Sequence, residues 1–330
     1  MPVVRIGTGR TLIGKGQIAA LTLTATTTGA GQTVTIHRMT PATGKSLTIL
    51  WGDGNSTVVA AGDTAAKSNV YAATGTYSIT VTAARDIVQI DLHDSKLSGF
   101  KSSELAASAI TYFTCYSLGA AVASVVNSSH MSGWTPTFWY LHSMPAGNYA
   151  IDSSHMSGWT PTQWYLYSMP AGNYAIDSSH MALWTPTYWY LFSMPAGTYS
   201  IDSSHMSGWT PTTWYLLSIT GGGAGWTLAA ANFAGFVRCT IFQIQGNALT
   251  QAQVNAVLYG MYQATLSRTV TGGTINVGGT NAAPSGVYQA AAACPVDAAT
   301  PGKEVAHELL NNGCGAIAAG ETWATVTFSV

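Results

Sequence analysis

Hydrophobic and polar residues alternate along short stretches in the middle of the chain. In residues 138–142, Trp139 and Leu141 alternate with Phe138, Tyr140 and His142. Because successive side chains of a strand point to opposite faces, this pattern predicts a strand with Trp139 and Leu141 facing the core. The Pro and Gly of the following MPAGN end that strand, and a second short extended piece, YAID, leads into a DSSHM turn.

The same pattern returns every 25 residues in four near-copies, marked by His130, His155, His180 and His205. Weaker copies precede and follow them, with apolar residues at the same spacing in 90–97 and 242–249. Self-similarity at such a period is the signature of a repeat architecture in which each unit contacts its neighbours. We therefore expect a β-solenoid of 25-residue turns over residues 86–249.

The last copy, FQIQGNAL, places Phe242, Ile244, Asn247 and Leu249 in the frame LxLxxNxL. This frame resembles the strand signature of leucine-rich repeats. In the near-copies Trp replaces the first Leu, and Met144, Met169 and Met194 replace the Asn. The chain thus resembles a divergent, Trp-rich leucine-rich-repeat protein of the bacteriophage structural or bacterial surface type.

The N-terminal part carries two segments, LTILWGDGNSTV and YAATGTYSITV, within residues 15–85. They resemble the polycystic-kidney-disease (PKD) family, which implies a β-sandwich over residues 1–85. The residues that carry this resemblance are Trp51, Gly52, Asp53, Gly54, Tyr71, Gly75, Thr76 and Tyr77.

The C-terminal part, residues 250–330, changes to helical periodicity. TQAQVNAVLYGMYQ predicts a helix with Thr250 as its N-cap, and TPGKEVAHELLNNG predicts another with Thr300 as N-cap and Pro301 at the first position. ETWATVTFSV alternates as a terminal strand. This order of elements predicts a small α/β cap that covers the last apolar turn of the solenoid. For the chain as a whole, the predicted fold class is mainly β.

The composition of the chain restricts the classes of partner that it is expected to bind. Only 8% of residues are charged, the net charge is −1, and no Lys or Arg lies between Lys101 and Arg238. A nucleic-acid surface needs basic residues to neutralise phosphates, so we expect no nucleic-acid partner. No apolar run suits a signal peptide or a membrane span, so we expect no membrane insertion. A low-charge, hydroxyl-rich surface is typical of virion and cell-surface proteins.

The four cysteines form no CxxC pair, and we expect no cofactor. Cys115 and Cys239 fall on apolar positions and are predicted to be buried. Cys294 and Cys314 flank a predicted helix, and both a disulfide and two free thiols remain open at this point.

The repeats also build rows of His and of Asp, the latter from Asp152, Asp177 and Asp202. Equivalent positions of stacked turns lie roughly 5 Å apart, which is too wide for a tetrahedral zinc site. An ion ladder is an alternative, but we expect each His to bond the neighbouring turn and each Asp to cap its own. An active site is a local break in repetition, so no catalytic or metal-binding residue is predicted.

Differences among the near-copies concentrate on the outward positions of the predicted strand, around a constant Tyr. Aromatic residues there supply rigid contact area, which indicates a binding face, with neutral surface drift as the alternative. The predicted binding residues are Phe138, Tyr140, His142, Gln163, Tyr165, Tyr167, Tyr188, Tyr190, Phe192, Thr213, Tyr215 and Leu217.

These features together predict a non-enzymatic recognition or structural protein. The resemblance implies a phage virion appendage or decoration protein that binds a host-surface glycan or protein and contacts other virion proteins. Open edges of the solenoid favour a homo-oligomer. A bacterial cell-surface adhesin and a polysaccharide-cleaving tailspike-like enzyme are the alternatives.

Overall fold

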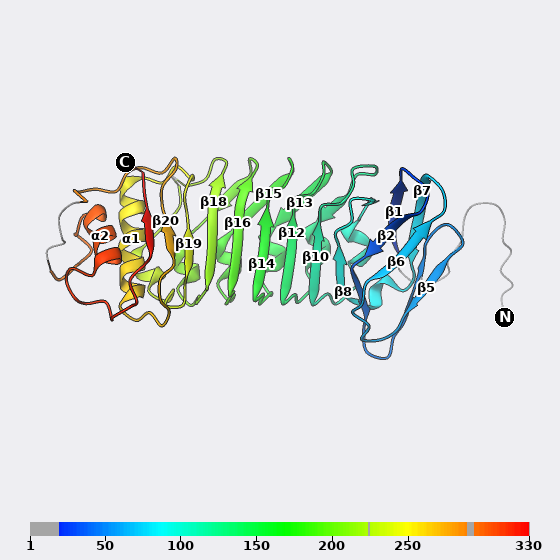
Figure 1. The fold of residues 1–330 in the computed structure, drawn as a ribbon, viewed down its shortest axis with the longest axis horizontal. Coiled ribbons are helices and arrows are strands. Elements are labelled where there is room, and N and C mark those ends of the chain that lie inside the picture. Colours follow the sequence, from blue (N-terminus) through cyan, green and yellow to red (C-terminus); the bar gives the residue numbers. More distant parts are fainter. Residues whose placement is uncertain (1–19, 224, 289–293, 330) are drawn as a thin grey trace.

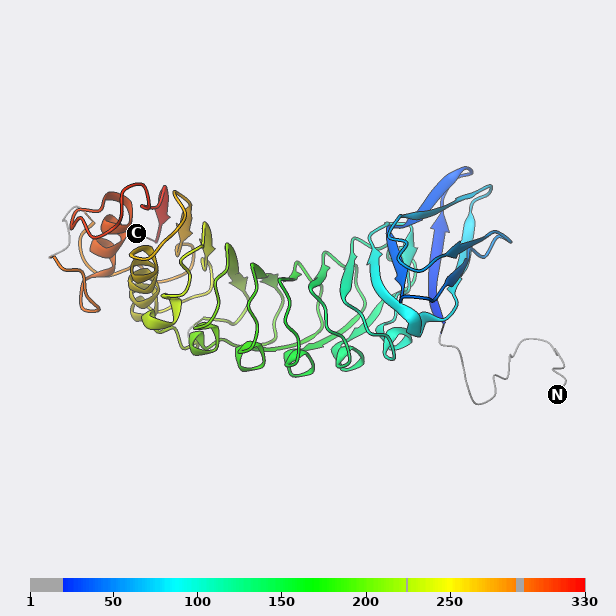
Figure 2. The same ribbon diagram turned by 90° about the horizontal axis from the view of Figure 1, so that it is seen from below.

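The computed structural model describes residues 20–223, 225–288 and 294–329. The molecule is an elongated, curved row of strands with an N-terminal β unit at one end and two α-helices at the other (Figures 1 and 2). The prediction of a mainly β fold is confirmed, and many of its strands run parallel.

A ten-stranded sheet runs through the repeats from the N-terminal unit to the C-terminal part, in the order β21-β20-β19-β18-β16-β14-β12-β10-β8-β3. All neighbours are parallel except β3 and β8. The strands are β3 (Arg38–Pro41), β8 (Ile87–Leu92), β10 (Tyr112–Tyr116), β12 (Phe138–His142), β14 (Gln163–Tyr167), β16 (Tyr188–Met194), β18 (Thr213–Ile219), β19 (Ile241–Gln243), β20 (Thr274–Asn276) and β21 (Thr325–Thr327).

The 25-residue period has a direct structural cause. Each near-copy adds one strand to this sheet, in a register that places Trp139, Trp164, Trp189 and Trp214 side by side. It also adds one strand to a parallel four-stranded sheet, made of β11 (Val125–Asn127), β13 (Asn148–Asp152), β15 (Asn173–Asp177) and β17 (Thr198–Ser200). The ten-stranded sheet follows the inside of the curve, and short 3-10 turns follow the outside (Figure 2).

Tryptophan fills the space between the sheets. The inward residues of the near-copy strands, Trp and Leu, are fully buried as predicted. The Trp139 and Trp164 rings stack at 5.5 Å and 13°. A second buried row, formed by Trp134, Trp159, Trp184 and Trp209, packs against the first at a tilt. The parallel ladder sets the spacing of identical rings, so the repeat builds its core by stacking.

The N-terminal unit contains an antiparallel five-stranded sheet and a strand pair. The sheet order is β5-β4-β7-β1-β9, from β1 (Leu21–Thr27), β4 (Leu47–Leu50), β5 (Ser56–Val59), β7 (Gly75–Val81) and β9 (Leu97–Ser98). The pair is β2 (Gln32–Ile36) with β6 (Lys67–Tyr71). The buried Tyr71 hydroxyl donates to the Trp51 carbonyl at 2.8 Å, which joins the two segments of the PKD resemblance. Residues 1–19 lie outside the described residues.

Strand pairing links this unit to the repeats. β3 adds to the edge of the ten-stranded sheet through β8, while β9, which follows β8 in the chain, pairs with β1. The expected boundary after residue 85 falls in the short 3-10 turn Ala84–Asp86 between β7 and β8. The two parts therefore exchange strands across that turn.

The C-terminal part holds α1 (Gln251–Thr265) and α2 (Gly302–Asn311). Thr250 forms a capping box with Gln253, which confirms the first predicted N-cap. The second was wrong by one residue, because Pro301 is the N-cap of α2 and the Thr300 hydroxyl accepts from the Asp297 N–H at 2.9 Å. The predicted terminal strand is reduced to β21. No helix among the described residues is long and apolar enough to cross a membrane.

The four cysteines divide into two classes. Cys115 and Cys239 are buried free thiols, as predicted, and burial raises the pKa of both. Cys294 and Cys314 form a disulfide across a sequence separation of 20 residues, which decides between the two possibilities left open by the sequence.

Removal of this disulfide is expected to destabilise the C-terminal part. Closing a loop of this length reduces the conformational entropy of the unfolded chain, which stabilises the fold by about 3 kcal/mol. Cys314→Ser should therefore lower the free energy of unfolding by a similar amount. Urea unfolding followed by circular dichroism measures the loss. Cys239→Ser, which touches no disulfide, separates loss of the cross-link from loss of a thiol. Equal stability of Cys314→Ser and the parent protein would contradict the prediction.

Candidate binding face

The predicted binding residues all lie on the outward side of β12, β14, β16 and β18, aligned in register across the four strands. Eleven of the twelve are half-buried. Thr213 is only 5% exposed, so the prediction that it faces solvent was wrong. Its short side chain lies between the larger Tyr188 and Ile241, which pair with it on the two flanking strands. We call this outward side the aromatic face.

Tyrosines at the middle position form one row, the tyrosine row, made of Tyr140, Tyr165, Tyr190 and Tyr215. Ring centroids of Tyr165 and Tyr190 lie 4.2 Å apart at 11°. Tyr140 donates a hydrogen bond from its hydroxyl to the Gln163 side-chain oxygen. Burial raises the pKa of Tyr140 to about 12 and shifts those of Tyr165 and Tyr190 in the same direction. The row therefore presents neutral hydroxyl groups at physiological pH.

A longer row of rings runs beside it and reaches into the N-terminal unit. In this outer ring row, neighbouring centroids lie between 3.4 and 4.7 Å apart with interplanar angles of at most 21°. Its members are His37, His93, Tyr116, His142, Tyr167 and Phe192.

The first three members of the outer ring row were missed by the sequence reasoning. Tyr116 precedes His142 by one residue more than the 25-residue period, so the period alone does not match the two. The alignment of Cys115 with Leu141, which was made from the sequence, nevertheless places Tyr116 beside His142. His37 lies between β2 and β3, and periodicity carries no signal for it.

The rings of the outer ring row stack face to face, as do Tyr165 and Tyr190, so their faces cover one another and mainly their edges and hydroxyl groups reach solvent, whereas Tyr140 is tilted by 56° from Tyr165. The regular stacking of rings ends between β16 and β18. Leu217 pairs with Phe192 where another ring would continue the outer ring row. Tyr215 is turned by 60° from Tyr190 and by 72° from Phe192.

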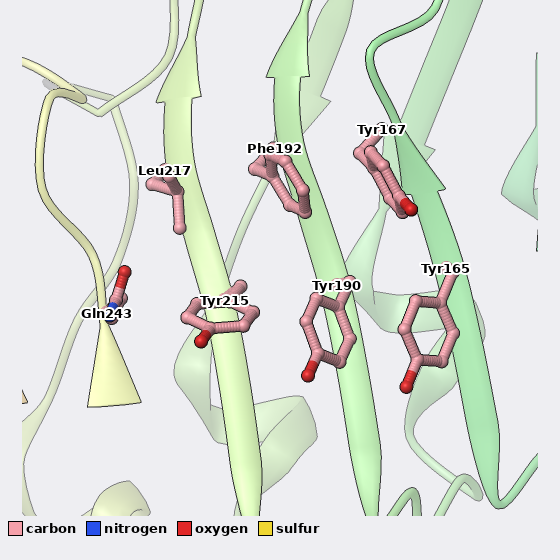
Figure 3. A pocket seen from close by; sticks show the side chains of 7 residues that line it. All are labelled: Tyr165, Tyr167, Tyr190, Phe192, Tyr215, Leu217 and Gln243. Atoms are coloured by element: carbon pink, nitrogen blue, oxygen red, sulfur yellow. The ribbon is translucent and has the colours of Figure 1, made fainter. Parts of the chain in front are cut away.

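A hollow of about 300 Å³ opens at this point (Figure 3). Six of the predicted residues and one further residue line it: Tyr165, Tyr167, Tyr190, Phe192, Tyr215, Leu217 and Gln243. Gln243 was missed, although alternation around Phe242 in β19 places it on the outward side. The remaining predicted residues lie on the same face outside the hollow: Phe138, Tyr140, His142, Gln163, Tyr188 and Thr213.

The aromatic face is electrically neutral around the hollow, whose lining contains no Asp, Glu, Lys, Arg or His. His142, farther along the outer ring row, is buried enough that its pKa falls from 6.5 to about 4. It is therefore uncharged at physiological pH and stacks as a neutral ring between Tyr116 and Tyr167.

Acid is expected to destabilise the protein through His142. The unfolded imidazole binds a proton near its ordinary pKa of 6.5, whereas the folded one does so only near 4. Between these values the unfolded state binds more protons, so the free energy of unfolding falls as pH falls, by up to ~1 kcal/mol per pH unit for a partly solvated ring. Urea unfolding at pH 7 and pH 5 measures this slope.

The matched variant is His142→Phe, which keeps a ring in the outer ring row and removes the titrating group. Its stability should depend less steeply on pH than that of the parent protein. The lowered pKa of His37 acts in both proteins and cancels from the difference. Identical slopes would show that His142 does not titrate between the two states.

The His and Asp rows lie in the turns and serve local structure. His180 contacts the Ser153 hydroxyl of the preceding turn through Nδ1 at 2.9 Å, and the other His residues of the row do the same, as predicted. Asp177 caps its own turn by accepting from the Ser179 N–H at 2.8 Å, and Asp152 and Asp202 do likewise. These bonds depress the pKa of Asp152 and Asp202. No group of three or more His, Cys, Asp or Glu suited to a metal ion occurs in the described part of the chain.

No protein-family model, curated protein or solved structure matches the chain. The aromatic face is therefore interpreted from its own geometry. It combines a rigid sheet, half-exposed rings at regular spacing and one hollow at the end of the ring rows.

Proposed function

We propose that the protein is a non-enzymatic recognition protein that binds a ligand on an external surface through the aromatic face. The observation that carries this proposal is the concentration of half-exposed aromatic side chains around one hollow on the inside of the curve. A buried tryptophan core holds these side chains on regular strands. Rigid aromatic groups lose little conformational entropy on binding, which suits them to contact a ligand.

In finer architectural terms, we propose a leucine-rich-repeat-like β-solenoid between a PKD-like β-sandwich and an α/β cap. The parallel registers and the 25-residue period support the solenoid. The contact between Trp51 and Tyr71 supports the PKD-like unit. Gly52 supports it too, since its φ is +84° and a Cβ there would lie 2.5 Å from the Ser78 carbonyl oxygen.

The biological setting that we propose is the surface of a phage particle, as an appendage or decoration protein. The very low charge and the resemblance of FQIQGNAL to leucine-rich repeats of phage and surface proteins support this setting. The partners are then a host-surface glycan or protein, other virion proteins and further copies of the chain. A bacterial adhesin would use the same face.

Attachment to cells tests the proposal. The labelled full chain is incubated with a panel of bacterial cells, and bound protein is measured. Replacing the four residues of the tyrosine row by Ser should abolish attachment. The matched control replaces the exposed Asn148 and Asn173 of the four-stranded sheet by Ser and should leave attachment unchanged. A quadruple variant that is folded by circular dichroism and still attaches fully would contradict the proposal.

The enzymatic alternative has its own variant. Asn127 caps its turn in the way that the three Asp residues cap theirs, so Asp152→Asn, Asp177→Asn and Asp202→Asn together should preserve the fold. If the parent protein shortens a capsule polysaccharide and this triple variant does not, the protein is an enzyme and the proposal is wrong.

A further inference from the structure

The hollow differs from the rest of the aromatic face because ring faces are uncovered there. Phe192 stacks on Tyr167 at 4.3 Å and 10°, which covers one side of its ring. Its other side faces the position of Leu217, the residue paired with it in register (Figure 3). Tyr215, tilted out of the tyrosine row, lies next to Phe192 with a centroid distance of 6.1 Å. A ligand can therefore stack on a ring of the outer ring row here, whereas farther along that row it meets ring edges.

We infer that the hollow binds one neutral pyranose ring of a glycan, with the C–H face of the sugar against Phe192 and Tyr215. This inference rests on the proposed function and specifies its ligand. An aromatic face carries a negative quadrupole that attracts the weakly positive C–H groups of a sugar. The volume of about 300 Å³ lies at the lower limit of roughly 300–1,000 Å³ for small-molecule sites, which suits a single ring better than a peptide segment.

Polar groups around the hollow match the hydroxyl groups of a sugar. The hydroxyls of Tyr165 and Tyr190 point the same way in Figure 3, and burial raises the pKa of both, so each can donate and accept. The Gln243 side chain adds an amide on the opposite side. An apolar side chain of a protein partner would fill the space but would add no hydrogen bond to these polar groups.

Charge selects among sugars. The lining contains no cationic residue that could pair a carboxylate or sulfate. Burying an acidic sugar there would leave its charge uncompensated, which is costly. The hollow therefore favours a hexose or N-acetylhexosamine over a sialylated or uronic acid residue. Within the described residues the near-copies hold one such subsite, because their stacked outer ring row ends at Phe192, next to Leu217.

A single substitution tests this geometry without weakening the fold. Leu217→Phe places a ring next in register after Phe192, where the ladder spacing brings it to stacking distance. The new ring covers the free face of Phe192 and fills the hollow. The matched control, Asn148→Phe, also adds a phenyl ring at an exposed strand position, but on β13 of the four-stranded sheet, outside the aromatic face.

The experiment uses immobilised neutral oligosaccharides of hexoses and N-acetylhexosamines, together with sialylated counterparts, and the purified full chain. The parent protein should bind at least one neutral oligosaccharide. Leu217→Phe should weaken that binding about ten-fold or more with an unchanged or higher melting temperature. Asn148→Phe should bind like the parent protein.

Each other outcome has a defined meaning. Binding by Leu217→Phe at parental affinity would overturn the placement in the hollow, and binding of sialylated oligosaccharides alone would overturn the neutral class. Attachment to cells that is lost after protease treatment of the cells, with no glycan bound, would overturn the glycan inference and leave the proposed function standing. Attachment to no cell and binding to no glycan would contradict both.

Discussion

Replacing Trp164 by Ala is expected to lower the free energy of unfolding by about 3–5 kcal/mol. The Trp164 side chain is fully buried. Its ring stacks between Trp139 at 5.5 Å and Trp189 at 5.7 Å, and Trp184 packs on it at a tilt. Backbone ladders on both sides fix the spacing of the strands, so the cavity cannot collapse and the loss approaches the upper part of this range.

Urea unfolding measures the loss, and two variants separate its causes. The Trp164 indole N–H has no conventional hydrogen-bond partner, so Trp164→Phe retains a stacked ring and removes an unsatisfied group. It should therefore cost much less than the change to Ala. Tyr165→Ser alters the adjacent outward position and should cost less as well. A loss of under ~1 kcal/mol for Trp164→Ala would show that the tryptophan stack does not support the fold.

The position along the chain at which Trp164→Ala destabilises the fold can also be measured. Stacked repeats contact only their neighbours, so stability is a sum of local and nearest-neighbour contributions. Hydrogen exchange of Trp164→Ala should rise in β12, β14 and β16 before it rises in the N-terminal unit. A uniform increase along the whole chain would indicate that the molecule unfolds as one cooperative unit.

The repeating part of the fold could be predicted because local pattern and tertiary contact coincide there. In a parallel ladder of identical turns, a residue contacts its equivalent 25 positions away, so alternation and period determine both burial and neighbours. The buried Trp139 and Leu141, the half-exposed Tyr140 and the bond of His180 to the preceding turn all follow from this rule.

Features that depend on pairing between unlike segments could not be predicted in this way. The antiparallel pairing of β3 with β8, and with it the stacking of His37 on His93 at 3.4 Å, joins segments that share no period. The hollow is an intermediate case. Leu217 was recognised as an outward residue, but the uncovered face of Phe192 follows only from ring spacing and tilt.

Asn247 shows how one residue of the leucine-rich-repeat frame works where the near-copies use Met. Its side chain is 1% exposed and donates to the carbonyl oxygens of Leu216 and Ile244, while it accepts from the Ile219 N–H at 3.0 Å. Asn281 continues the arrangement by accepting from the Asn247 N–H at 3.0 Å. Two asparagines thus satisfy the backbone where the repeats meet the cap, and only the first was identified from the sequence.

Asn247→Ala is expected to lower the free energy of unfolding by about 2–5 kcal/mol. It removes the side-chain partner of two buried backbone groups, the Ile219 N–H and the Leu216 carbonyl, at roughly 1–3 kcal/mol each, while the Ile244 carbonyl keeps its bond from Asn281. Urea unfolding gives the size of the loss. Hydrogen exchange should show faster exchange of the Ile219 amide in particular, since its acceptor is gone. The control is Thr280→Ala, which removes an exposed bond to the adjacent Ala248 N–H and should cost under ~0.5 kcal/mol. If both variants lose the same stability, the buried asparagine network does not secure the junction between the last repeat and the cap.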